Sequence, residues 1–242
     1  MEDRATLLSS LARAMAQQDP STTLAARLCS SAVTLLGGEG ASITLTYSGH
    51  ERVTLCSSGD TAARLADLQD VFGQGPSWQA FDSGEQQLWM SHDASAEQPW
   101  PALAHEVRSG LGSVSVCALP IRPDHEVLGV LTCHFPTGSA PLLDHAHAQF
   151  LADAIGVALL RDPETTASDA SGPWTAQAQI HQATGMVVAQ LHIGLEDALA
   201  LLRAHAFAAD QSLAATAESV VGRGLDFTDP DSTGTTDPNG TS

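Results

Sequence analysis

The chain has 242 residues, of which 43% are hydrophobic and 16% are charged, so it can form one large domain or two small ones around an apolar core. Its 28 acidic residues far outnumber its ten basic ones, all arginine, and the formal net charge is −18. This charge disfavours nonspecific binding to nucleic acid or to an anionic membrane, because like charges repel. No apolar run approaches the roughly 20 residues that span a bilayer, and the N-terminus does not resemble a signal peptide. We therefore expect a cytoplasmic protein that does not bind membranes.

The first two thirds of the chain alternate between helical and strand periodicity. The expected elements are, in order, helices over 3–18 and 21–36, a hairpin with strands near 43–47 and 53–55, a helix over 60–72, a short helix from Ser77 to Gly84, a short strand over 88–90, a helix over 101–109, strands over 113–121 and 126–135, and a helix over 141–160. Helices that flank an antiparallel sheet define an α+β fold class.

The last third is helical. Apolar residues recur at helical spacing over 175–191, over 195–209 and after Ser212, which has the character of an N-cap, so a three-helix bundle is predicted over 174–227. Residues 162–173 combine acids and prolines without a large apolar side chain, as in a linker. The acidic tail, 228–242, has nothing to bury and is predicted to be disordered. The N-terminal domain therefore spans 1–161.

The four cysteines show no CxxC spacing and lie among apolar residues. This distribution favours buried thiols in a reducing compartment over disulfides. No motif of a nucleophile with its base, no phosphate-binding loop and no set of metal ligands is found. His145 and His147 are two residues apart, so a helix would place them on different faces. We expect a protein without enzymatic activity, metal or cofactor.

The helical region resembles the ANTAR family, the RNA-binding output domains of bacterial transcription antiterminators. The resemblance lies in residues 180–221, IHQATGMVVAQLHIGLEDALALLRAHAFAADQSLAATAESVV. It implies that the C-terminal domain binds an RNA hairpin in the leader of a transcript. Where ANTAR domains usually have a lysine before the glycine of the first helix, this chain has Thr184. The expected domain also has only two arginines, Arg203 and Arg223, to contact phosphates.

The N-terminal domain resembles the GAF family of sensor domains. The resemblance rests on Gly73-Gln74-Gly75-Pro76 followed by Ala80-Phe81 and Gly84, on the strand 113–121, and on Leu128-Gly129-Val130-Leu131. The two resemblances together imply a homodimeric transcription regulator in which a GAF-like sensor modulates RNA binding, with pairing through 3–36 and 141–160. The alternative is a small-molecule sensor or protein-interaction module whose helical domain no longer binds RNA.

If the helical domain binds RNA, the expected site combines Thr184 and Gly185 on its first helix with Arg203 and His205 on its second. A guanidinium suits phosphates and base edges, but Arg203 is equally consistent with a surface arginine paired with an acid. Gly185 lies within a helix, where glycine is unfavourable, and close approach of another helix or of RNA explains it. His205 is either a potential cation or an ordinary surface histidine.

In the GAF-like domain, the candidate ligand-binding residues are Trp78, Trp89 and Cys117. The resemblance implies a cavity under the sheet, in which the tryptophans would stack on a planar small molecule. The alternative is a filled core without a ligand. Cys117 and its neighbour Cys133 on the adjacent expected strand have apolar surroundings, which favour inert thiols over a redox sensor.

Overall fold

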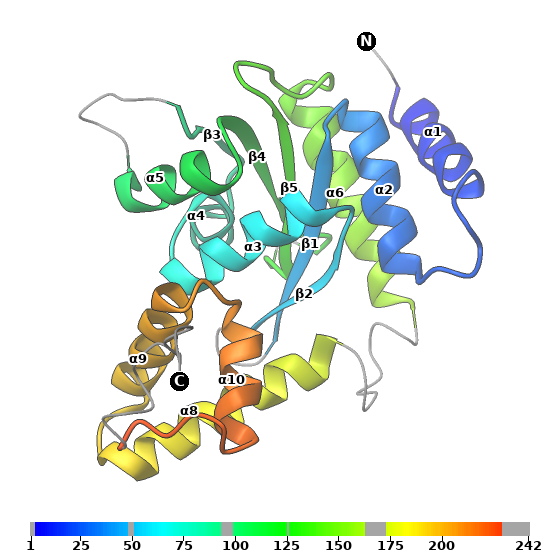
Figure 1. Cartoon of the computed structure of the whole chain (residues 1–242). Coiled ribbons are helices and arrows are strands. Elements are labelled where there is room, and N and C mark those ends of the chain that lie inside the picture. The colour runs from blue at the N-terminus through cyan, green and yellow to red at the C-terminus, as the bar shows by residue number, and fades with distance from the viewer. Residues whose placement is uncertain (1–2, 48–50, 93–98, 125, 163–172, 229–242) are drawn as a thin grey trace, which may run out of the picture. The chain divides into compact units, whose positions relative to one another are not determined.

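The computed structural model describes residues 3–47, 51–92, 99–124, 126–162 and 173–228, and the chain divides into two compact units, 1–168 and 169–242 (Figure 1). The predicted linker, 162–173, and the predicted tail, 228–242, lie almost entirely outside the described residues.

The N-terminal unit is built on a five-stranded antiparallel sheet with strand order β2-β1-β5-β4-β3. The strands are β1 (Gly40–Tyr47), β2 (Glu51–Ser57), β3 (Gln87–Met90), β4 (Val114–Ile121) and β5 (Gly129–Pro136). The predicted hairpin pairs as β1 with β2, and the two long apolar strands pair as β4 with β5. The short strand β3 lies at the edge, so one side of it has no neighbouring strand within the sheet.

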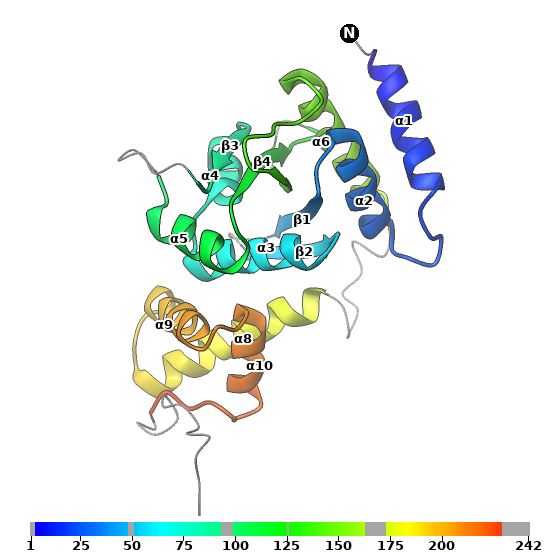
Figure 2. The same cartoon turned by 45° about the horizontal axis from the view of Figure 1, so that its top comes forward.

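Helices cover both faces of this sheet (Figure 2). The helices on one side are α1 (Arg4–Ala16), α2 (Leu24–Leu36) and α6 (His145–Leu160), and those on the other are α3 (Asp60–Phe72), α4 (Pro76–Ser83) and α5 (Pro101–Gly110). Because both faces are covered, every residue of β4 is buried. The predicted α+β architecture is confirmed at this level.

The larger core lies between the sheet and the helices α2 and α6. Its fully buried side chains include Leu28, Ile43, Leu131, Phe135 and Ile155. Helix α1 packs on α2 and α6 rather than on the sheet, and it buries Leu7 and Leu11 against them. Much of the apolar stripe of 3–18 is thus covered within the chain.

Several element boundaries differ from the sequence expectation, including the starts of α6 and β5. The last helix of the unit begins at His145 and not at 141, because the Asp144 carboxylate accepts a hydrogen bond from the His147 backbone N–H (3.0 Å) and caps the helix there. Strand β5 begins at Gly129 and not at 126. Both shifts shorten elements whose apolar residues alone suggested a longer span.

In the described part of the C-terminal unit, 173–228, three helices pack against one another: α8 (Pro173–Leu191), α9 (Leu195–Ala208) and α10 (Leu213–Val221). Ser212 caps α10 by accepting from the Ala215 backbone N–H (3.1 Å), as predicted. The fully buried residues of this bundle are Ala183, Val187, Ala198, Leu202, Ala206, Thr216, Ala217 and Val220. Most are small, so the helices approach closely.

Within the described parts of the chain, no single helix is both long and apolar enough to cross a membrane. The helices Ala178–Leu191 and Leu195–Ala208 together have the length and apolar composition of a span, but the chain bends by 108° between them.

Candidate functional site

Arg52 organises a polar cluster on the face of the sheet that α3 and α4 cover. Its guanidinium lies 4.4 Å from the centre of the Trp78 ring and donates a hydrogen bond of 2.6 Å to the Ser77 hydroxyl. Its Nε lies 3.6 Å from a carboxylate oxygen of Asp70. The Arg52 side chain is only 6% exposed, so its charge is compensated inside the protein. Trp78 thus stacks on a side chain of its own chain.

A second carboxylate, Asp67, lies three residues before Asp70 on the same helix. Burial raises its pKa to about 6, and the nearby Asp70 carboxylate contributes to the rise. Gln69 lies between Asp67 and Asp70 in the chain, and its side chain is buried. It accepts a hydrogen bond from the Ser77 backbone N–H (2.8 Å), which connects α3 to α4.

Trp89 lies on the same face of the sheet as Trp78 but belongs to a different cluster. It is 5% exposed and packs edge-to-face on Trp100, with ring centroids 6.1 Å apart. It belongs to a buried apolar cluster with Leu65, Leu68, Leu103, Ala104, Val107, Val114 and Val116. Trp89 is therefore part of the apolar core on this face.

Cys117 points to the opposite face. It pairs with Cys133 across β4 and β5 and packs in the core under α2 and α6, whereas its neighbour Val116 shares the face of Trp89. The expected ligand group is therefore corrected: the sheet separates Cys117 from Trp78 and Trp89, and the three residues do not line one cavity.

The central strands carry buried polar residues on the α3–α5 face that sequence reasoning missed. Ser42 and Thr44 on β1 and Thr132 and His134 on β5 are at most 5% exposed. Burial lowers the pKa of His134, while the Glu39 carboxylate acts in the opposite direction. Along each strand these residues alternate with apolar ones. That pattern ordinarily marks a solvent-facing side, and only the covering helices bury it.

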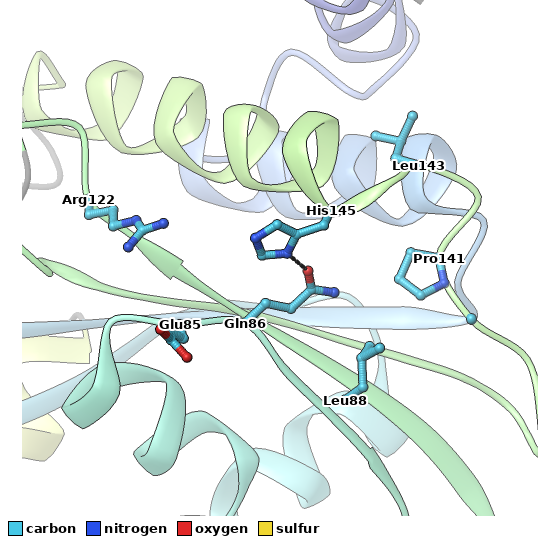
Figure 3. A pocket seen from close by; sticks show the side chains of 8 residues that line it. Glu85, Gln86, Leu88, Arg122, Pro141, Leu143 and His145 are labelled. Atoms are coloured by element: carbon cyan, nitrogen blue, oxygen red, sulfur yellow. Dashed lines mark hydrogen bonds between the residues drawn. The ribbon is translucent and has the colours of Figure 1, made fainter. Parts of the chain in front are cut away.

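An open pocket of about 670 Å³ lies on the α6 side of the sheet, at the edge formed by β3 (Figure 3). Three chain segments meet there, and its lining residues are Glu85, Gln86, Leu88, Arg122, Ala140, Pro141, Leu143 and His145. Helices α2 and α6 cover the central strands on this side, whereas Leu88 of β3 is 65% exposed. The pocket is the space that the helices leave uncovered beside the edge strand.

Hydrogen bonds hold the polar side chains of this pocket. Arg122 Nη1 donates to the Gly84 carbonyl (2.5 Å), at the left-handed end of α4. Gln86 Nε2 donates to the Cys117 sulfur (3.2 Å), and Gln86 Oε1 contacts His145 Nδ1. Cys117, expected to bind a ligand, thus supports a lining residue from beneath.

All four thiols are free. Burial raises the pKa of Cys117 to about 12 and also raises that of Cys133. A hydrogen bond with Cys29 and burial raise the pKa of Cys56. Because the thiolate is the reactive form, Cys56, Cys117 and Cys133 are poor nucleophiles. Among the residues that the structure describes, no three His, Cys, Asp or Glu side chains gather to hold a metal ion.

In the helical unit, the structure separates the two expected RNA-contacting residues of α8. Thr184 is 5% exposed, and its hydroxyl donates to the Ile180 carbonyl of its own helix (2.7 Å), so it does not belong to the surface. Gly185 is exposed, and, apart from its chain neighbours and the nearby backbone of its own helix, no described atom lies within 4 Å of the Cβ position that a larger residue would occupy. Close packing of another helix of the unit therefore does not explain this glycine.

The two expected residues of α9 are both half-buried. The His205 ring packs edge-to-face on Phe227, with centroids 5.7 Å apart. Arg203 lies two residues earlier on the same helix. The expected constellation therefore reduces to three residues that remain at least partly accessible, Gly185, Arg203 and His205.

Comparison with known proteins identifies the N-terminal unit. The family model of the GAF domain matches residues 18–160, which is more than half of the chain, and the protein belongs to this family of sensor domains. None of the curated proteins matches the sequence significantly.

Similar solved structures include the GAF-B domain of DevS from Mycobacterium smegmatis (19% identity, 64% of this chain and 92% of that one, TM-score 0.37). The GAF domain of A. aeolicus NLH2 in an inactive state is 15% identical over 66% of this chain and 97% of that one, with a TM-score of 0.43. A domain of a sensor histidine kinase protein from Sinorhizobium meliloti is 15% identical over 61% and 96%, with a TM-score of 0.44.

Proposed function

We propose that this protein is a signal-sensing regulator whose GAF domain binds a small organic molecule in the pocket beside β3. The observation that carries this proposal is the convergence of Arg122, Gln86 and His145 on a pocket with an apolar wall. Its volume of about 670 Å³ suits a small molecule. Regulation by binding, and not by catalysis, fits the raised pKa values of the thiols.

Filling the pocket is expected to abolish ligand binding. Ala140 is exposed and lines the pocket, so Ala140→Trp places an indole there without disturbing the core. Thermal unfolding of the full chain, recorded with mixtures of small metabolites, should reveal a compound that stabilises the wild type by about 2.7 kcal/mol at 100 times its Kd. Ala140→Trp should lose this response.

The matched control is Ala102→Trp, which adds the same side chain at an exposed position of α5. It should keep the response to the compound. Equal stabilisation of the wild type and Ala140→Trp by every active compound would contradict binding in this pocket.

The proposed output is binding of a structured RNA leader by the helical unit, which favours antitermination of transcription. The resemblance of residues 180–221 to ANTAR domains supports it, as does the exposed glycine at 185, which leaves the α8 backbone open to an external partner. Loop bases of an RNA hairpin are recognised by hydrogen bonds and stacking more than by a broad positive field, so the acidic charge is compatible with such binding.

Replacing Arg203 by alanine tests the RNA site. Crosslinking the protein to cellular RNA and sequencing the recovered fragments identifies the target, and Arg203→Ala should bind it at least about tenfold more weakly, with a shallower salt dependence. Helical content, measured by circular dichroism, should stay unchanged. If Arg203→Ala binds the recovered leader as tightly as the wild type, Arg203 has no part in the site.

We include dimerisation and a cytoplasmic location in this proposal. Leu8 of α1 and Val157 and Leu160 of α6 are exposed apolar side chains on two helices that contact each other, a surface suited to a second copy. Light scattering at micromolar concentrations distinguishes a dimer from the 25.1 kDa monomer. Four free cysteines fit a reducing compartment.

A second candidate function is a small-molecule sensor whose helical unit binds a protein instead of RNA. The burial of Thr184 favours it, as does the presence of only Arg203 and Arg223 as arginines in this unit. In that case crosslinking recovers no specific RNA, while the thermal response to the ligand persists.

A further inference from the structure

The pocket beside β3 has a polar end and an apolar end. Figure 3 shows Arg122 at one end and Leu88, Pro141 and Leu143 at the other, with His145 and Gln86 between them. A ligand that satisfies both ends must combine an apolar body with a polar head. The arrangement thus restricts both the chemistry and the orientation of the molecule that the pocket holds.

Arg122 is positioned to receive an anion. Its backbone N–H donates to the Asp153 carboxylate (3.0 Å), and its Nη1 donates to the Gly84 carbonyl (2.5 Å). Hydrogen bonds therefore fix both the backbone and the guanidinium of this residue. Among the described residues, no carboxylate lies within 4.0 Å of its guanidinium nitrogens. The remaining N–H groups of the guanidinium can still donate, and their planar arrangement matches a carboxylate.

Gln86 and His145 add a second fixed polar contact. Because Gln86 Nε2 donates to Cys117, its Oε1 accepts from the neighbouring His145, which places the proton on Nδ1 and leaves Nε2 as the other polar atom of the ring. Side chains held in this way lose little entropy when a ligand binds.

The apolar end has exposed surface to cover. Leu88 is 65% exposed, and Pro141 and Leu143 are partly exposed beside it. Covering such surface with an apolar ligand is favourable at about 25 cal/mol per Å². Glu85 also lines the pocket, and its negative charge disfavours a dianion such as a phosphate monoester more than a monoanion.

We infer that the pocket binds a small monocarboxylate with an apolar body, its carboxylate on Arg122 and its body against Leu88, Pro141 and Leu143. This inference rests on the proposed function, since it names the ligand class of the same pocket. The site lies on the α6 side of the sheet, away from the Arg52 cluster that fills the α3–α4 side.

A matched series of compounds tests the ligand class. Binding of 4-phenylbutyrate to the full chain is measured by isothermal titration, beside 4-phenylbutanamide, 4-phenylbutylamine and 3-phenylpropyl phosphate, which keep the apolar body and change the head. The carboxylate should bind at least about tenfold more tightly than each of the others, because only it matches the guanidinium without excess charge.

Two variants and one control test where the carboxylate and the apolar body of the ligand bind. Arg122→Gln should weaken binding of 4-phenylbutyrate at least about tenfold. Leu88→Asn, at an exposed position that does not threaten folding, should weaken it about fivefold through lost apolar contact. Arg108→Gln is the control: Arg108 also donates to a backbone carbonyl, that of Ser91 (2.5 Å), but it lies on α5, so its loss should leave binding unchanged.

The outcomes test the proposed ligand class and the proposed binding pocket separately. Binding of the amide, the amine or the phosphate as tightly as the carboxylate, or full binding by Arg122→Gln, would overturn the monocarboxylate. If the series fails while another metabolite still binds and loses its binding in Ala140→Trp, the class is wrong and the proposed function stands. If no compound shows binding that Ala140→Trp removes, both are wrong.

Discussion

Replacing Gly129 by alanine is expected to destabilise the GAF domain by about 3 kcal/mol, at the upper end of overpacking effects. A Cβ at this position would clash with the Thr44 carbonyl oxygen and would lie 2.8 Å from the Leu45 Cα. Both are backbone atoms of β1, which pairs with β5 at this point, so no side-chain rotation relieves the clash. Urea unfolding followed by circular dichroism measures the loss.

The control for this prediction is Gly110→Ala. Gly110 ends α5, and, apart from its chain neighbours and the nearby backbone of its own helix, no described atom lies within 4 Å of the position that an alanine Cβ would take there. The same change should therefore alter stability by less than about 0.5 kcal/mol. Equal stability of the two variants would contradict the close approach of β1 and β5.

Replacing Asp70 by alanine is expected to cost about 2 to 3 kcal/mol of unfolding free energy. The change leaves the buried Arg52 guanidinium without this carboxylate, and an uncompensated buried charge is strongly unfavourable. The expected loss is below that of a fully buried pair because the Asp70 side chain is 26% exposed. Urea unfolding at neutral pH gives the value.

Two further variants show whether the charge is the cause. The double change Arg52→Met with Asp70→Ala removes both charges and should recover part of the lost stability. Asp82→Ala, at an exposed position of α4, should be nearly neutral. A double variant less stable than Asp70→Ala would mean that the contacts of Arg52 with Ser77 and Trp78 outweigh its ion pair.

Most helices and strands follow from local patterns in the sequence. The alternation of Ile43, Leu45 and Tyr47 indicated a strand, and β1 spans Gly40–Tyr47. The helical spacing over 60–72 matches α3 at both ends, since Gly73 follows it in the left-handed conformation that ends a helix. The predicted boundary of α6 was wrong because a capping residue sets it. The Asp144 carboxylate starts the helix at His145, and the pattern of apolar residues carries no information about such a cap.

The candidate site was much less predictable. Trp78, Trp89 and Cys117 were grouped because the chain and the family resemblance brought them near one another, yet the sheet separates Cys117 from the two tryptophans. The pocket residues Gln86, Arg122 and His145 carry no shared motif, and the sequence pattern singles out only His145, whose spacing from His147 argues against a metal site. Their one sequence signal was an arginine directly after an apolar strand in a chain with few arginines.

The sequence by itself determined the α+β class, the resemblance to GAF domains and the order of nearly every element, because each depends on periodicity and turn residues within a few positions. Only the tertiary structure decided which faces are covered. Coverage by helices on both sides buries Ser42 and Thr44, although polar residues that alternate with apolar ones ordinarily face solvent. Incomplete coverage beside β3 opens the pocket, because segments far apart in the chain meet at a sheet edge that no local pattern specifies.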